Sequence, residues 1–153
     1  MKIIHTADIH LGARPDPGYT WSREREQEIW NSFRRLIERV KEERADFLLV
    51  AGDLFHRQPL LRELKEVNYL FASIPETTVV LMAGNHDYLA GNSCYPGFPW
   101  SRNVIGLWDE RCRRVPVPGK DTCVYGCSYH SREVCENLYR GARPQGRETF
   151  HIL

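Results

Sequence analysis

Short apolar runs alternate with longer segments of helical periodicity along the first half of the chain. The runs at residues 3–7, 47–51 and 79–83 are rich in β-branched or aromatic residues, and turn or helix signals bound each of them. Such runs predict strands that are buried within a sheet.

Between these runs, apolar residues recur at three- and four-residue spacing, which predicts two helices that pack on the sheet. We expect Ser22 to cap the first helix, and Pro59 and Pro75 to bracket the second. The apolar stripes are Ile29, Trp30, Phe33, Leu36, Ile37 and Val40 in the first helix, and Leu61, Leu64, Val67, Leu70 and Phe71 in the second. This order of strands and helices favours an α/β fold with parallel strands and right-handed crossovers.

The second half is richer in turns and gives weaker signals. Residues 89–100 form a loop with several aromatic side chains, and short strands are expected near 104–107, 113–117 and 123–128. Turn-rich sequence of this kind is typical of antiparallel pairing. Residues 133–139 favour a short helix or a turn, residues 140–148 a polar loop, and residues 150–153 the start of a strand.

Composition narrows the class of protein without identifying it. A chain of 153 residues is expected to form one domain, and its net charge of +1 gives no global attraction to nucleic acid. The chain contains no apolar stretch near the ~20 residues that cross a bilayer and no signal-peptide pattern, so we expect a cytoplasmic protein that does not contact membranes. The five cysteines, with no C-x-x-C pair, indicate reduced thiols.

Side chains typical of metal ligands follow all three apolar runs. Asp8 and His10 follow the first run, Asp53 follows the second, and Asn85 and His86 follow the third. The carboxyl ends of neighbouring parallel strands meet at one edge of an α/β sheet, where active sites of such folds lie. The sequence therefore predicts a metal-dependent hydrolase.

The ligand types suit a pair of divalent cations. Asp8 and His10 are one residue apart, so both would project to the same side of an extended segment. The Asp53 carboxylate can bridge two ions ~3.5–4 Å apart, and Asn85 adds a neutral carbonyl oxygen. Mixed oxygen and imidazole ligation favours manganese, iron or zinc over calcium.

His86 is the candidate catalytic group. A tight turn after Gly84 could aim its imidazole across the metals, where it could protonate a leaving oxygen or stabilise charge on phosphorus. Asp87 either orients that imidazole or caps the following turn, and the cap is the favoured interpretation.

The motifs D-I-H at 8–10, G-D-L-F-H at 52–56 and G-N-H-D at 84–87 closely resemble those of the calcineurin-like metallophosphoesterase superfamily. Within it, H-T-A-D-I-H-L-G and A-G-D-L-F-H are similar to the SbcD-type DNA-repair exonuclease subunit. The resemblance implies a metallophosphoesterase-like sandwich of β-sheet flanked by helices over residues 1–153, with two divalent metal ions, most simply Mn²⁺, in its site.

The resemblance also implies roles for individual residues. Asp8 and His10 would bind the first metal, Asp53 would bridge both ions, and Asn85 would bind the second. His86 would be the catalytic imidazole. His56 would contact substrate, or alternatively be a packed loop histidine.

The chain departs from the family pattern in its later histidines. The family completes its site with a histidine in an H-G context and two more in a G-H-x-H motif, and neither motif is present here. His5, His130 and His151 have no motif support and are not assigned to the metals. We therefore expect the chain to be the N-terminal portion of a longer nuclease, with partial metal occupancy and little turnover.

The function that follows is a metal-dependent phosphodiesterase, a DNA exonuclease or endonuclease of the SbcD type. The resemblance implies DNA and an SMC-like ATPase as partners, and dimerisation through helices near the site. Two alternatives stay open: a phosphatase or small-nucleotide phosphodiesterase of the same superfamily, and a non-catalytic interaction module with a residual metal site.

Overall fold

The computed structural model describes residues 1–153 and contains two β-sheets and two helices. The elements in chain order are β1 (Ile3–Thr6), α1 (Ser22–Glu42), β2 (Phe47–Ala51), α2 (Leu61–Ala72), β3 (Thr78–Met82), β4 (Val104–Gly106), β5 (Arg113–Pro116), β6 (Thr122–Gly126) and β7 (Phe150–Ile152). Each predicted strand is present, with ends that differ by at most two residues from the predicted ranges. The predicted α/β class is confirmed.

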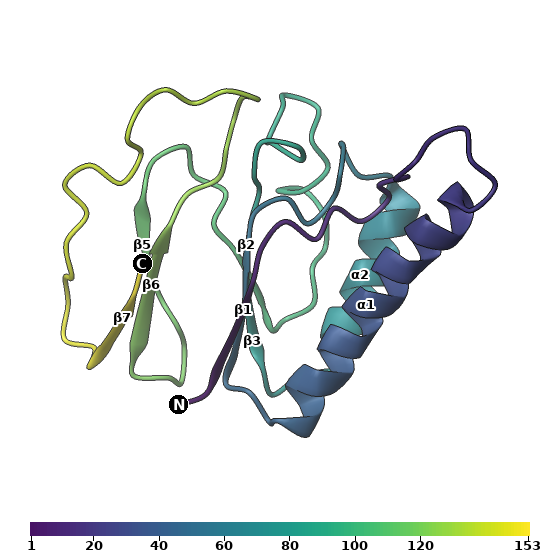
Figure 1. Cartoon of the computed structure of the whole chain (residues 1–153). Helices are drawn as coiled ribbons and strands as arrows, with labels where there is room; N and C mark the ends of the chain where they lie inside the picture. Colours follow the sequence, from purple (N-terminus) through teal and green to yellow (C-terminus); the bar gives the residue numbers. More distant parts are fainter.

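The first sheet is parallel throughout and has the strand order β1-β2-β3-β4. Helix α1 connects β1 to β2, and α2 connects β2 to β3. Figure 1 shows both helices on one side of this sheet and strands β5–β7 on the other. Because β1, β2 and β3 run in the same direction, the loops that follow them leave from the same edge.

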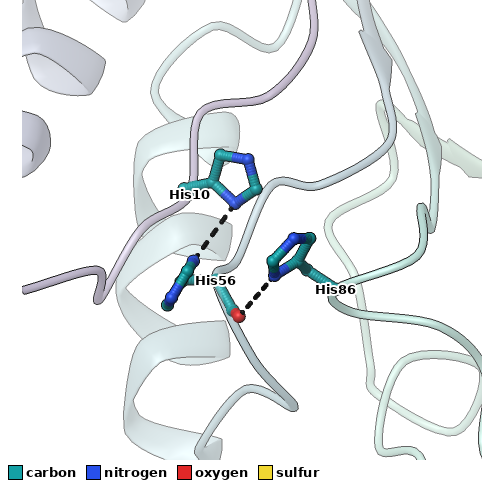
Figure 2. A group of neighbouring side chains, drawn as sticks. All are labelled: His10, His56 and His86. Atoms are coloured by element: carbon teal, nitrogen blue, oxygen red, sulfur yellow. Dashed lines mark hydrogen bonds between the residues drawn. The ribbon is translucent and has the colours of Figure 1, made fainter. Parts of the chain in front are cut away.

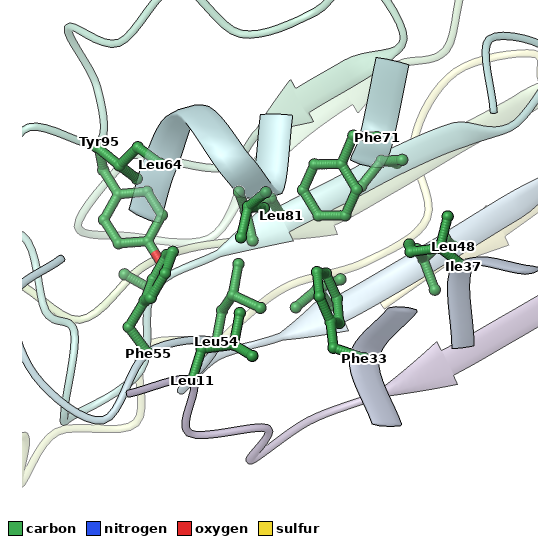
Figure 3. Close-up of a cluster of buried hydrophobic side chains, with 14 of the residues drawn as sticks. Leu11, Phe33, Ile37, Leu48, Leu54, Phe55, Leu64, Phe71, Leu81 and Tyr95 are labelled. Atoms are coloured by element: carbon green, nitrogen blue, oxygen red, sulfur yellow. The ribbon is translucent and has the colours of Figure 1, made fainter. Parts of the chain in front are cut away.

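Side chains of the central strands alternate between the two faces of the first sheet. Leu48 and Val50 of β2 belong to a core of 20 buried residues on the helix side, whereas Phe47 belongs to a smaller core on the side of the second sheet. This is the period-two alternation of a strand. Figure 3 shows the helix-side core, in which Phe33 of α1 and Phe71 of α2 lie near Leu81 of β3.

The second sheet has the order β5-β6-β7 and packs on the first through five buried residues. Strands β5 and β6 pair antiparallel, as expected. The expectation of antiparallel pairing is wrong for β4, which pairs parallel with β3. Strand β7, for which no direction was predicted, pairs parallel with β6. The long connection 83–103 returns the chain to the start of β3 and so permits the parallel pairing of β4.

The prediction that all three N-terminal strands are buried is wrong for β1. This strand lies at the sheet edge and pairs only with β2, and Ile3 is 38% exposed. An apolar run alone does not distinguish an edge strand from a central one, because both require one apolar face.

The predicted cap of the first helix is wrong by one residue. Ser22 is the first residue of α1 and not its cap, a position taken by Trp21, which forms no side-chain cap bond. Helix α2 begins after Leu60, whose backbone N–H donates to Glu63 Oε2 at 2.7 Å. Residues 133–139 contain bends and turns and no helix, which is the second of the two predicted options.

Neither of the two helices combines the length and the apolar character that crossing a membrane requires.

Candidate metal centre

The loops after β1 and β2 run side by side beyond the ends of the strands. The backbone N–H of His10 donates to Asp53 O at 2.9 Å, and the N–H of Leu11 donates to Leu54 O at 2.8 Å. The N–H of His56 then donates to Leu11 O at 3.0 Å. These bonds hold the first two candidate ligand loops in fixed register.

Three candidate ligands have left-handed backbone conformations. Asp8 has φ 53°, His10 has φ 54° and Asp53 has φ 50°. Each such residue costs about 1–3 kcal/mol and is typically found where function requires an unusual side-chain direction. The predicted reason for the proximity of Asp8 and His10, an extended segment, is therefore wrong, because the chain turns at both residues.

Two glycines allow the loops after β2 and β3 to approach each other closely. Gly52 has φ 86°, and a Cβ there would lie 3.1 Å from Gly84 Cα. A Cβ on Gly84 would lie 2.7 Å from the backbone nitrogen of Asp53 and closer still to its carboxylate. The glycines of the G-D and G-N motifs, Gly52 and Gly84, thus allow Asp53 to pack against the loop after β3.

Asp8, His10 and Asp53 form an oxygen-rich group. Their candidate ligand atoms lie within 4.8 Å of one another, and His10 Nε2 is 3.9 Å from Asp8 Oδ1 and 4.0 Å from Asp53 Oδ2. The Asp53 side chain is only 8% exposed, and its Oδ1 accepts a hydrogen bond from the His86 N–H at 2.9 Å. A buried carboxylate with so few partners is a favourable position for a cation.

His10, His56 and His86 form a second, nitrogen-rich group whose ligand atoms also lie within 4.8 Å of one another. Figure 2 shows the three rings together. His10 Nδ1 lies 3.4 Å from His56 Nδ1, and the ring centres of His10 and His86 are 4.6 Å apart. Slight desolvation by the surrounding groups, and then the nearby His86 and His10, lower the pKa of the exposed His56, which favours its neutral form.

The imidazole of His86 is fixed by a backbone carbonyl. Its Nδ1 lies 3.1 Å from His56 O, and because a carbonyl can only accept, Nδ1 carries the proton of this bond. The Nε2 atom of neutral His86 is therefore the nitrogen with a free lone pair. This tautomer suits both a proton carrier and a metal ligand.

Asn85 lies between two residues that contact Asp53. The backbone of Gly84 lies close to the Asp53 carboxylate, and the backbone N–H of His86 donates to that carboxylate. The backbone therefore brings Asn85 to the same edge as Asp8, His10 and Asp53, as the motif order predicted.

Asp87 supports the loops, and none of its hydrogen bonds goes to the His86 ring. Its carboxylate accepts from Gly84 N at 2.8 Å, from Phe55 N at 3.0 Å and from the hydroxyl of Tyr95 at 2.7 Å. Burial raises the pKa of Asp87 above its usual 3.8, although all three bonds favour the charged form. Both interpretations of Asp87 are therefore wrong. Its hydrogen bonds go back to Gly84 and across to Phe55 and Tyr95, so its carboxylate joins separate loops and does not cap the turn that follows it.

Tyr95 supports the candidate site through its bond to Asp87, and the sequence did not predict this role. It is fully buried in the helix-side core, and burial followed by the Asp87 charge raises the pKa of its hydroxyl well above 10. Its position in the aromatic loop 89–100 was the available signal, but no spacing rule connects it with Asp87.

The remaining histidines lie outside both groups, as expected. His130 Nε2 is 2.9 Å from Trp108 O, and His151 Nδ1 is 3.0 Å from the Tyr125 hydroxyl. His5 lies within β1, ahead of the ligand loops.

Comparison with known proteins identifies the family. The family model "Calcineurin-like phosphoesterase" matches residues 1–149. The DNA double-strand break repair protein Mre11 of Aeropyrum pernix is 37% identical over 89 residues, which cover 56% of this chain and 21% of the relative. Mre11 of Archaeoglobus fulgidus is 39% identical over 127 residues, which cover 79% of this chain and 27% of the relative.

The metallophosphoesterase YhaO of Bacillus subtilis is 30% identical over 167 residues, which cover 99% of this chain and 39% of the relative. The chain thus spans between about a fifth and two fifths of the length of these relatives. Because the family model covers nearly every residue, the resemblance inferred from the three motifs is confirmed, and the chain belongs to the calcineurin-like phosphoesterase family.

Proposed function

We propose that this chain is a metal-dependent phosphodiesterase that acts on DNA as a nuclease of the SbcD type. The observation that carries the proposal is Asp53, a buried carboxylate at the meeting point of the loops that follow β1, β2 and β3. Its neighbours, Asp8 and His10, lie at distances that a shared cation would bridge.

The donor set fits divalent metal ions. Asp8 and Asp53 provide two carboxylates beside one imidazole, and no lysine or arginine forms an ion pair with either carboxylate. Asp8, His10 and Asp53 would hold one ion, and Asp53 and Asn85 would hold the second. Mixed oxygen and nitrogen ligands suit Mn²⁺, with iron and zinc as the other options.

Bound metals would supply a water activated for attack and would neutralise charge on the phosphate. The chain itself supplies a proton at His86. Because Nδ1 keeps its proton on the His56 carbonyl, Nε2 is the nitrogen that would take up a proton from solvent and pass it to the leaving oxygen. The exposed His56 stands next to it, where it can contact a substrate phosphate.

DNA is the proposed substrate because two of the relatives cited above are named as DNA double-strand break repair proteins. The motif resemblance adds an SMC-like ATPase as partner, a homodimer as the assembly and the cytoplasm as the compartment.

A phosphodiesterase assay tests the proposal. We expect Mn²⁺-dependent hydrolysis of a bis-aryl phosphate to exceed that of a mono-aryl phosphate, at a low absolute rate. His86→Ala should lower the rate by about 10²–10⁴-fold through loss of the proton donor. Asp53→Asn should lower Mn²⁺ affinity at least about tenfold. His5→Gln changes an exposed histidine outside the site and is the matched control.

Two results would overturn the proposal. Preference for the mono-aryl phosphate would favour a phosphatase of the same family. Absence of turnover with Mn²⁺, iron and zinc, together with DNA binding that survives Asp53→Ala and His86→Ala, would favour an interaction module with a residual site.

A further inference from the structure

His10 presents its two ring nitrogens to two different groups. Nε2 lies 3.9 Å from Asp8 Oδ1 and 4.0 Å from Asp53 Oδ2, whereas Nδ1 lies 3.4 Å from His56 Nδ1. A neutral imidazole has one lone pair and one N–H, so it can ligate through only one nitrogen at a time. An ion held through Nδ1 therefore excludes an ion held through Nε2.

The nitrogen-rich group has the spacing of a metal site. Zinc–nitrogen bonds of 2.0–2.1 Å in a tetrahedron place neighbouring ligand atoms about 3.3–3.4 Å apart. The two Nδ1 atoms of His10 and His56 are 3.4 Å apart, and the ligand atoms of all three histidines lie within 4.8 Å. The His86 ring would have to move closer to this pair to complete the tetrahedron.

The orientation of His86 adds independent support. Metal-bound histidines usually donate their other ring N–H to a carbonyl or carboxylate, which fixes the ring and its tautomer. His86 is already held in this way by the His56 carbonyl, shown as a dashed line in Figure 2. Its Nε2 is free to ligate.

We propose that His10, His56 and His86 form a zinc site that competes with the oxygen-rich centre for His10. Three imidazoles without a carboxylate favour Zn²⁺ over Mn²⁺, which prefers oxygen ligands. Zinc in this position also takes the lone pair of His86, the proposed proton carrier. Zn²⁺ bound at these three histidines would thus inhibit the Mn²⁺-loaded phosphodiesterase. This consequence rests on the function proposed above, whereas the zinc site itself does not.

The exposure of the group makes the site reversible. His56 is exposed and His10 and His86 are partly exposed, so the fourth zinc position is open to water. Zinc can therefore enter and leave without unfolding the loops.

Titration of the chain with Zn²⁺ tests the site directly. Calorimetry without manganese gives the Zn²⁺ affinity, and electron paramagnetic resonance of the Mn²⁺-loaded chain gives the zinc concentration that releases manganese. We expect His56→Ala to weaken Zn²⁺ binding at least about tenfold and to raise the releasing concentration equally. Mn²⁺ affinity should not change in this variant, and His5→Gln should behave as the parent chain. Circular dichroism confirms that each variant is folded.

The same titration of Asp53→Asn separates the two sites. Zn²⁺ affinity should survive this substitution, and zinc X-ray absorption should show three imidazole nitrogens. Zn²⁺ binding that is lost with Asp53→Asn but unchanged by His56→Ala would overturn the proposal, and so would a carboxylate-rich absorption spectrum. The calorimetry needs neither Mn²⁺ nor turnover. The Zn²⁺ affinity therefore tests the zinc site even if the phosphodiesterase assay fails.

Discussion

The two faces of the parallel sheet are covered very differently. On the helix side, Leu48, Val50, Val79 and Leu81 are all at most 1% exposed and belong to a core of 20 residues. On the other side the core has five residues. Leu49 and Met82 there are only partly buried, and an apolar cavity of about 350 Å³ opens between the two sheets.

The candidate ligand loops pack into the helix-side core and not into the opposite core. Leu11, Leu54 and Phe55 in the ligand loops, and Tyr95 behind Asp87, are all members of the helix-side core. None of the five residues of the opposite core lies in a ligand loop. We therefore expect the geometry of the site to depend on the helix side and to tolerate changes on the other.

The largest effect should follow a cavity on the helix side. Phe71 is fully buried in α2 and packs edge-on against Phe33 of α1. Phe71→Ala should lower the free energy of unfolding by about 3–5 kcal/mol and weaken Mn²⁺ binding in the same protein. Urea denaturation and calorimetry measure the two quantities, and a large loss of stability with unchanged Mn²⁺ affinity would contradict the coupling.

A matched cavity on the opposite face should cost less. Leu107 is 4% exposed and lies next to the open cavity. Leu107→Ala should lower the free energy of unfolding by about 2–3 kcal/mol, the lower part of the usual range, since this leucine already borders empty space. Mn²⁺ affinity should stay at the parental value, and a fall comparable to that of Phe71→Ala would remove the distinction between the two faces.

A smaller effect should follow loss of the second carboxyl oxygen of Asp87, which joins the loops to the helix-side core. In Asp87→Asn, the buried N–H of Phe55 or the partly buried N–H of Gly84 faces an amide NH₂, which should cost about 2 kcal/mol. Tyr95→Phe removes only the hydroxyl donor and is the milder control.

The effect of Asp87→Asn should depend on pH. Because burial raises the pKa of Asp87 above 3.8, the folded protein keeps this proton to higher pH than the unfolded chain. The advantage of the parent over the variant is therefore greatest below pH 3.8 and shrinks as pH rises through the raised pKa. Urea denaturation at several pH values checks the sign, and a gap that widens with pH would contradict it.

The sequence was sufficient to place the candidate ligands at one edge of the sheet because strand order and direction determine which loops meet. Asp53 follows the central run of the three, and parallel pairing with both neighbours brings the other ligand loops to it. The family motifs agree with this placement because the same geometry requires glycine at 52 and 84.

Other features depend on contacts that local patterns do not encode. The left-handed turns at Asp8 and His10 are stabilised by backbone bonds to the loop after β2, which lies far along the sequence. Tyr95 reaches Asp87 through the fold of an irregular loop. The parallel pairing of β4 depends on the path of the connection 83–103, which has no periodic signal.

The most direct test of the account is an anomalous-scattering measurement on crystals grown with Mn²⁺. The account predicts manganese bound by Asp8, His10 and Asp53, with any second ion bound by Asp53 and Asn85. Manganese found elsewhere, or these four side chains without an ion at saturating Mn²⁺, would contradict the claim that the three loops form a metal centre.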